Sequence, residues 1–255
     1  MYTNHAELIR MIACIPKVIT CIPRPLPALL RTIRHRILYD DWYENSMILV
    51  RREFNVWLYA RGDQLIDACL LDEPKTWSYV KKLVMRNRVT SMLDVGANIG
   101  GYSVVLGRKI RVVAMEPMPD TCAMLNLNVR LNRVDVRALR AAAYDKSCPI
   151  VKLRRSPSHS GGDFVSPEGN IEAPAYTLDD VWDKYGPFDL VKIDVEGSEV
   201  EVLEGLSCVP KYLVVELRPY TEACLKKFPL TRMKILAFEK LVRGSAFNVI
   251  AKRTE

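Results

Sequence analysis

Short apolar segments alternate with helical segments along most of the chain, and this alternation restricts the fold more than any other feature. Five segments have the length and composition of buried strands: residues 91–96, 110–117, 134–143, 188–194 and 211–219. Helical patterns, such as those of residues 120–131 and 198–206, lie between most of these strands. Alternation of this kind predicts parallel βαβ units with right-handed crossovers.

Two further pairs of β-rich segments flank the alternating region. Residues 47–62 contain two such runs joined by a polar turn, and helical spacing follows them. Residues 233–241 and 247–253 are separated by "VRGSA", which is too short for a helical crossover and therefore predicts an antiparallel hairpin. The predicted fold class is α/β: a Rossmann-like, seven-stranded, mostly parallel sheet with an antiparallel edge hairpin and helices on both faces.

The N-terminal segment, residues 1–45, differs in composition from the rest and is predicted to be a basic extension of one domain, residues 46–255. Prolines interrupt its apolar runs, and no window approaches the roughly 18 uncharged residues that span a bilayer. Arg10 and Lys17 argue against a signal peptide. The extension either packs on the domain or makes peripheral contact with an anionic membrane. We expect a cytoplasmic protein, with membrane association as the alternative.

Charge and cysteine content narrow the function classes only slightly. The net charge of +7 favours anionic partners without naming one. The seven cysteines contain no C-x-x-C pair, which is evidence against a zinc site and against a disulfide framework. A reducing compartment fits this pattern best. The oligomeric state cannot be predicted from these features.

A glycine-containing loop, "LDVGANIGGYS", follows the first strand of the alternating region and opens a helix. Its spacing is D-x-G-x-x-x-G, with Asp94, Gly96 and Gly100. Glu116 ends the next strand, where a carboxylate can accept hydrogen bonds from both hydroxyls of a ribose. Asn98 stands where the dinucleotide fingerprint has its second glycine, so NAD and FAD are disfavoured. The sequence therefore predicts a site for an adenosine-type nucleoside derivative.

These motifs, together with "MEPMPD…LNVRLN", "TLDDV" and above all "VKIDVEGSEVEVLEG", resemble the FkbM-type S-adenosylmethionine-dependent methyltransferases. The resemblance covers residues 47–253 and implies the class I methyltransferase fold, with strand order 3-2-1-4-5-7-6 and strand 7 antiparallel. It also implies S-adenosyl-L-methionine as cofactor. The implied cofactor residues are Asp94, Gly96 and Asn98 at the methionine end, with Gly100 in the same loop, Glu116 and Pro117 at the ribose, and Ala142 and Asp145 at the adenine.

The segment Ile193–Gly205 contains five carboxylates, and three of them have a structural explanation. Ser198 and Glu201 have the spacing of a capping box, Glu199 adds negative charge at the same helix start, and Glu204 is expected to be solvated. Gly205 can end the helix.

Asp194 and Glu196 precede this cap at the carboxyl end of a strand, where ligands of such sheets bind. Lys192 is unusual in the same strand, because buried parallel strands are normally apolar throughout. A buried lysine needs a carboxylate partner, so a purely structural Lys192–Asp194 pair is one interpretation. The other, favoured by the family resemblance, places Asp194 and Glu196 in the active site and Lys192 beside the substrate.

The predicted reaction is direct displacement, in which a carboxylate takes the proton of an acceptor hydroxyl. Asp194 is the first candidate for this base, Glu196 the second, and His159 a rival on the Ser/Gly loop of residues 156–170 that can cover the substrate. Glu216, at the end of the fifth strand, is a further acceptor-site candidate. Asp194 and Glu216 also suit Mg²⁺, but nothing in the spacing demands a metal, and none is predicted.

The resulting hypothesis is an O-methyltransferase that acts on a hydroxyl of a small molecule or glycan. A nucleic-acid methyltransferase, including an RNA 2′-O-methyltransferase, is the first alternative, but no P-P-Y or Pro-Cys motif follows the strands and Glu216 stands where a lysine would be needed. A non-catalytic binding module is the second alternative. The intact glycine loop and the "DVEG" acids argue against it.

Overall fold

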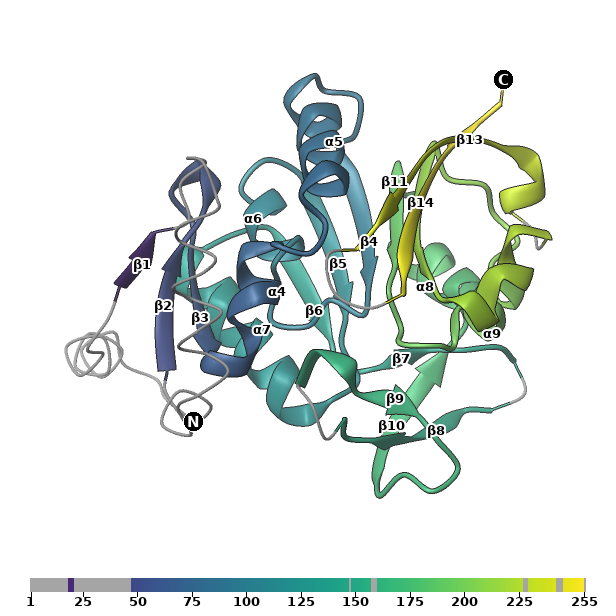
Figure 1. The fold of residues 1–255 in the computed structure, drawn as a ribbon, viewed down its shortest axis with the longest axis horizontal. Coiled ribbons are helices and arrows are strands. Elements are labelled where there is room, and N and C mark those ends of the chain that lie inside the picture. Colours follow the sequence, from purple (N-terminus) through teal and green to yellow (C-terminus); the bar gives the residue numbers. More distant parts are fainter. Residues whose placement is uncertain are drawn as a thin grey trace.

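A single seven-stranded sheet organises the chain in a computed structural model, which describes residues 18–20, 47–146, 148–156, 160–226, 229–241 and 245–254 (Figure 1). The order is β13-β14-β12-β11-β4-β5-β6. The strands are β4 (Ser91–Val95), β5 (Arg111–Met115), β6 (Val136–Leu139), β11 (Leu190–Ile193), β12 (Tyr212–Leu217), β13 (Met233–Lys240) and β14 (Phe247–Arg253). Strands β4, β5, β6, β11 and β12 pair in parallel, whereas β14 pairs antiparallel with β12 and β13. The predicted class, strand order and antiparallel hairpin are confirmed.

Helices cover both faces of this sheet because its strands alternate apolar side chains between two cores. Met92 of β4 lies in the same core as Val80 and Leu125, whereas its neighbour Leu93 lies with Val181 and Val202 in the other. The helices of the first face include α5 (Pro74–Met85), α6 (Ser103–Leu106) and α7 (Pro119–Asn132), and those of the second include α8 (Leu178–Tyr185) and α9 (Glu199–Glu204). Burial on both faces is what a parallel sheet requires.

A β-hairpin precedes the main sheet, as predicted, and two asparagines attach it to α7. Strands β2 (Met47–Arg51) and β3 (Trp57–Arg61) pair antiparallel, and β1 (Val18–Thr20) pairs parallel with β2. The side-chain amides of Asn128 and Asn132 exchange hydrogen bonds with the backbone of Tyr59 and Trp57, at 2.6–3.0 Å. The two side-chain amides therefore make hydrogen bonds to β3 that the backbone of a neighbouring strand would otherwise make. A short helix, α4 (Leu65–Cys69), follows the hairpin.

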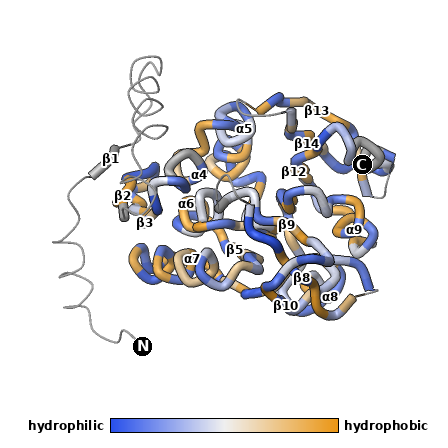
Figure 2. Tube along the Cα trace, turned by 60° about the horizontal axis from the view of Figure 1, so that its bottom comes forward, coloured by the Kyte–Doolittle hydropathy of each residue, from blue (hydrophilic) through white to orange (hydrophobic). Residues whose placement is uncertain are grey.

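A four-stranded sheet lies between β6 and α8, where the sequence predicted only the end of a strand and a Ser/Gly loop. Its order is β7-β10-β8-β9, with β7 (Ala142–Ala143), β8 (Ile150–Arg154), β9 (Phe164–Val165) and β10 (Ile171–Tyr176). Strands β8, β9 and β10 lie together in both Figure 1 and Figure 2. The predicted strand 134–143 is thus divided: Val136–Leu139 belongs to the main sheet and Ala142–Ala143 to this one. We call residues 142–176 the insertion.

The predicted capping box at Ser198 is wrong. Ser198 is the N-cap residue of α9, but its side chain makes no capping hydrogen bond, and Glu199 accepts one from the Gly197 backbone at 2.9 Å instead. Glu199 is 1% exposed, and its burial raises its pKa. A complete capping box does form at α8, where Thr177 and Asp180 hydrogen-bond reciprocally.

Two findings bear on the environment of the chain. Among the described residues, no helix is long and apolar enough to cross a membrane. Cys69 is disulfide-bonded, whereas Cys122, Cys148 and Cys208 are free. The sequence analysis argued against a disulfide framework and did not predict the bond at Cys69, since a single bond between two cysteines needs neither a C-x-x-C spacing nor an even total.

Candidate active site

One cavity of about 550 Å³ opens at the carboxyl ends of β4, β5, β11 and β12. This volume lies within the range of about 300–1,000 Å³ that is usual for small-molecule sites. Ten of the residues predicted from the sequence line it: Asp94, Gly96, Asn98, Glu116, Pro117, Ala142, Lys192, Asp194, Glu196 and Glu216. The cofactor end and the acceptor end that were predicted separately therefore belong to one continuous space.

Three predicted residues are not among those that line the cavity. Gly100 faces the core, where a Cβ atom would lie 2.4 Å from a methyl group of Val104. Asp145 lies after β7, which pairs with β10. The chain has left the cavity at that point, so Ala141, Ala142 and Ala143 form this part of the cavity wall instead. His159 lies outside the described residues.

The glycine loop is shaped by its contact with the neighbouring loop. Gly96 has φ +78°, and a Cβ atom there would lie 1.7 Å from the backbone oxygen of Asp194. Asn98 also has positive φ, which asparagine tolerates better than most residues. Its side chain accepts a hydrogen bond from the Ile99 backbone at 2.8 Å and donates one to Asp67 at 3.3 Å. The loop therefore presents its backbone to the cavity in a fixed conformation.

Glu116 is held rigidly beside this loop by two backbone donors. Its Oε2 accepts a hydrogen bond from the Asn98 backbone and its Oε1 one from Met118, both at 2.9 Å. Burial raises the pKa of Glu116 to about 7, although these hydrogen bonds oppose the shift. Each oxygen retains a second lone pair, so the carboxylate can accept hydrogen bonds from two adjacent hydroxyls. The residue fits the ribose of a nucleoside.

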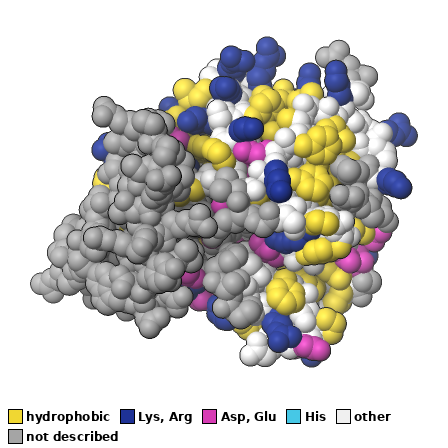
Figure 3. All heavy atoms as spheres, in the orientation of Figure 1, with side chains coloured by type: hydrophobic (Ala, Val, Ile, Leu, Met, Phe, Trp, Pro, Cys, Tyr) yellow, Lys and Arg dark blue, Asp and Glu magenta, His cyan; other side chains and the backbone are white. Residues whose placement is uncertain are grey.

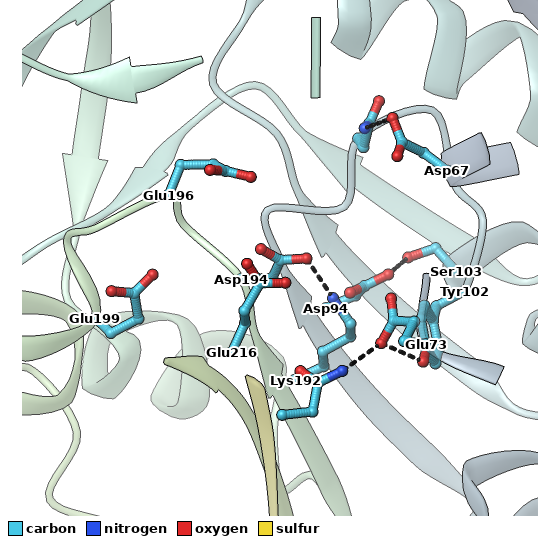
Figure 4. Close-up of polar contacts among 12 residues, drawn as sticks. Asp67, Glu73, Asp94, Tyr102, Ser103, Lys192, Asp194, Glu196, Glu199 and Glu216 are labelled. Atoms are coloured by element: carbon cyan, nitrogen blue, oxygen red, sulfur yellow. Dashed lines mark hydrogen bonds and ion pairs between the residues drawn. The ribbon is translucent and has the colours of Figure 1, made fainter. Parts of the chain in front are cut away.

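Three carboxylates meet at the other end of the cavity (Figure 4). Oxygens of Asp194, Glu196 and Glu216 lie within 4.8 Å of one another. Lys192, 4% exposed, donates to Asp194 Oδ2 at 2.9 Å, and Arg218 pairs with Glu196 and, at 3.1 Å, with Glu216. The internal Lys192–Asp194 pair and the placement of both residues in the cavity therefore occur together. The sequence analysis had treated them as alternatives.

Burial and like charge control the protonation of this cluster. Burial and the nearby Asp194 raise the pKa values of Glu196 and Glu216, although Arg218 lowers both. Burial alone would favour a neutral Lys192, but the carboxylates of Asp194, Glu73 and Asp94 outweigh it and raise the lysine pKa. The lysine stays charged, and one or more of the surrounding carboxyl groups can take up a proton near neutral pH.

Glu196 has an unusual backbone conformation that carries its side chain toward the cavity. Its φ is +58°, in the left-handed region that favours glycine or asparagine, and Gly197 follows with φ +113°. A conformation of this kind costs about 1–3 kcal/mol and tends to persist where function needs it. The strained turn supports a role for the Glu196 side chain beyond connecting β11 to α9.

A second polar network borders the cavity, and the sequence analysis missed it. Glu73, 8% exposed at the start of α5, accepts hydrogen bonds from the Tyr102 hydroxyl and from Asn248, both at 2.8 Å. Asp94 accepts a hydrogen bond from Ser103. Burial raises the pKa of Glu73 to about 7. No sequence motif identifies Glu73, because a glutamate before a proline at the start of a helix is common. Only the packing of the folded chain brings Glu73 close to Lys192.

The raised pKa values predict that acidification stabilises the folded protein between pH 8 and about pH 5.5. A carboxyl group whose pKa is higher in the folded than in the unfolded chain contributes stability below its unfolded pKa and loses it as pH rises through the folded pKa. Glu73 and Glu116 both titrate near pH 7 in the folded chain. The free energy of unfolding from urea titrations is therefore expected to be larger at pH 5.5 than at pH 8.

A double variant, Glu73→Gln with Glu116→Gln, isolates these two groups. Its gain in stability on acidification should be smaller than that of the wild type, whereas the exposed control Glu168→Gln should behave as the wild type does. Groups whose pKa is lowered in the folded chain, such as Asp120 with a pKa of about 2, change the free energy of unfolding only at lower pH. An equal pH dependence in wild type and double variant would contradict the prediction.

Sequence comparisons relate this chain to known methyltransferases. Residues 94–236, more than half of the chain, match the family model described as the methyltransferase FkbM domain. The hexuronic acid methyltransferase AglP of Haloferax volcanii is 34% identical over 117 residues, which cover 45% of this chain and 48% of AglP. The methyltransferase sdnD of Sordaria araneosa is 28% identical, with 55% of this chain and 74% of sdnD covered. The chain thus spans about half the length of AglP.

A tRNA (uracil-54, C5)-methyltransferase of Pyrococcus abyssi, solved with S-adenosyl-L-homocysteine, is a structural neighbour. It is 15% identical, with a TM-score of 0.48 and coverage of 82% of this chain and 44% of that one.

Proposed function

Since the chain belongs to the FkbM methyltransferase family, we propose that it transfers a methyl group from S-adenosyl-L-methionine to a hydroxyl of a small molecule or sugar. One observation carries the proposal: a single cavity has Glu116 and the glycine loop at one end and the Asp194, Glu196 and Glu216 carboxylates at the other. The name of the relative AglP, a hexuronic acid methyltransferase, supports a sugar as acceptor.

The residues present fit the cofactor. Glu116 would accept hydrogen bonds from the ribose hydroxyls, and Asp94, Gly96 and Asn98 would hold the methionine end. The cofactor supplies a methyl group on a positively charged sulfonium, which is already a strong electrophile. The negative charge of the acid cluster suits a cation of this kind.

The acid cluster provides the groups that an acceptor hydroxyl needs. Asp194 lies central among the carboxylates in Figure 4, and its pairing with Lys192 fixes its orientation. From there it would accept the proton of the hydroxyl as the new bond forms, with Glu196 as the second candidate. Glu216 and Arg218 would orient the rest of the acceptor.

The charge of the cavity disfavours nucleic acid as acceptor. Among the described residues that line it, nine carry carboxyl groups and only Lys192 and Arg218 are cationic. A phosphate backbone would be repelled here, because binding to nucleic acid depends on lysine and arginine contacts. Lysine and arginine side chains are scattered over the face drawn in Figure 3 rather than gathered at one place. These observations support a small-molecule or sugar acceptor over nucleic acid.

The cofactor assignment predicts that S-adenosyl-L-homocysteine binds saturably to the wild type in a calorimetric titration. Replacing Glu116 with alanine removes charge-assisted hydrogen bonds to the ribose, so the affinity is expected to fall at least about fivefold. The exposed Glu168→Ala variant is the matched control and should bind as the wild type does. Folded wild-type protein that binds no S-adenosyl-L-homocysteine would refute the proposed function.

A further inference from the structure

The insertion lines the part of the cavity beside Glu116, since its Leu153 packs in one core cluster with Met118 and its Asp163 carboxylate raises the pKa of Glu116. Its contribution to the wall is mostly apolar, with Leu153, Phe164 and Val165, and Met118 adds to it from the start of α7. One carboxylate, that of Asp163, also lines this end. A mostly apolar wall with a few placed polar groups is usual for small-molecule sites, and such a wall can pack against the face of a base.

The Asp163 carboxylate is buried, and one of its oxygens lacks a hydrogen-bond donor. The side chain is 5% exposed. Oδ1 accepts a hydrogen bond from the Ser156 backbone at 2.8 Å, but Oδ2 is buried and has no hydrogen-bond partner among the described residues. Arg155 Nη1 lies 3.8 Å away, and this guanidinium makes its shorter contact, 2.8 Å, with Asp120. Burying such an oxygen is unfavourable unless a ligand supplies the donor.

The chemistry of the neighbouring residues indicates which donor fits. Glu116 is placed for the two ribose hydroxyls, so the base attached to that ribose extends toward the apolar wall. The base of an adenine nucleoside has ring nitrogens that only accept hydrogen bonds, and its exocyclic amino group is the one donor. A carboxylate oxygen can pair with that group and with no other part of the base.

We propose that Asp163 recognises the adenine of the cofactor by accepting a hydrogen bond from its amino group at Oδ2, with the base held against Met118, Leu153 and Phe164. This inference rests on the proposed cofactor. It assigns base specificity to Asp163, directly before β9, rather than to Asp145, which follows β7 and was expected to serve. Asp163 is a specificity-determining residue and takes no part in the methyl transfer.

The test compares two ligands whose bases differ at position 6 and in a proton that the inosyl compound carries on the adjacent ring nitrogen N1. The Ser156 backbone holds Oδ1 of Asp163 and so opposes a shift of the carboxylate toward that proton. S-inosylhomocysteine carries an oxygen where S-adenosyl-L-homocysteine carries the amino group, and that oxygen would face the Asp163 carboxylate. In calorimetric titrations, the wild type is expected to bind the adenosyl compound at least tenfold more tightly. In Asp163→Asn the preference should fall to about twofold or less, because an amide can donate to the oxygen as well as accept from the amino group.

Asp145→Asn is the matched control and should keep the wild-type preference, since Asp145 does not line the cavity. Thermal unfolding of each variant checks that it folds. Wild-type protein that binds neither compound would refute the proposed cofactor. Wild-type protein that binds both equally, or an Asp163→Asn variant with an unchanged preference, would overturn the inference about Asp163 and leave the cofactor assignment intact. The relative affinity of the wild type for the two compounds tests the inference even if Asp163→Asn does not fold.

Discussion

Replacing Asp194 with asparagine is expected to lower kcat for methylation of a hydroxyl acceptor by about 10²–10⁴-fold, the usual contribution of a general base. The amide has the same shape but cannot take the proton. Binding of S-adenosyl-L-homocysteine should change by less than about threefold, because Glu116 and the glycine loop remain. Lys192 keeps the carboxylates of Glu73 and Asp94 near it, so the fold is expected to survive.

The measurement is transfer of a labelled methyl group to hydroxyl compounds, beginning with sugars, at saturating acceptor. Glu196→Gln should reduce kcat less than Asp194→Asn, and the exposed Glu204→Gln should not reduce it. Full activity of Asp194→Asn with a large loss in Glu196→Gln would transfer the role of base to Glu196. Full activity of both variants would leave His159 as the remaining candidate for the base.

Replacing Gly96 with alanine is expected to lower the free energy of unfolding by more than about 4 kcal/mol, a loss that single substitutions seldom produce. A Cβ atom would lie 1.7 Å from the Asp194 backbone oxygen, and neither strand end can move without breaking the β4–β11 pairing. Urea denaturation at constant pH measures the loss, and an insoluble variant would agree with it.

Gly197→Ala is the matched control because Gly197 also has positive φ. Its nearest neighbour would be the Tyr220 hydroxyl at 3.1 Å, and this tyrosine side chain is 70% exposed and can move aside. In Gly197→Ala only the backbone strain remains, so the free energy of unfolding is expected to fall by about 1–3 kcal/mol. Equal losses in the two variants would show that the contact with Asp194 does not determine the effect.

The central sheet and the acid cluster could be predicted because local patterns encode them. Apolar runs of strand length, short connections and a strict alternation leave few topologies for a chain of this kind. The carboxyl ends of adjacent parallel strands meet at one edge, so Asp94, Glu116, Asp194 and Glu216 had to converge once their strands were identified. Lys192 was recognisable because a charge is rare in a buried strand.

The remaining features depend on contacts between distant segments. Glu73 reaches the cavity only because α5 packs on the sheet, and Asp163 only because the insertion folds over the end of β5. Alternation of buried Val151 and Leu153 with exposed Lys152 was a usable signal for β8, but the Ser- and Gly-rich residues after it favoured a loop. The capping box failed at Ser198 since sequence spacing cannot reveal that Gly197 places the preceding turn in an unusual conformation.

The insertion leaves and rejoins the domain at adjacent points, because Ala142 and Ala143 pair with Ala175 and Tyr176. A segment with neighbouring ends can change in length and sequence without moving the strands that it leaves. The acid cluster, by contrast, comes entirely from the main sheet and its strand ends. Evolution or protein engineering could therefore exchange residues 144–174 to alter affinity for the nucleoside while leaving the methyl-transfer chemistry unchanged.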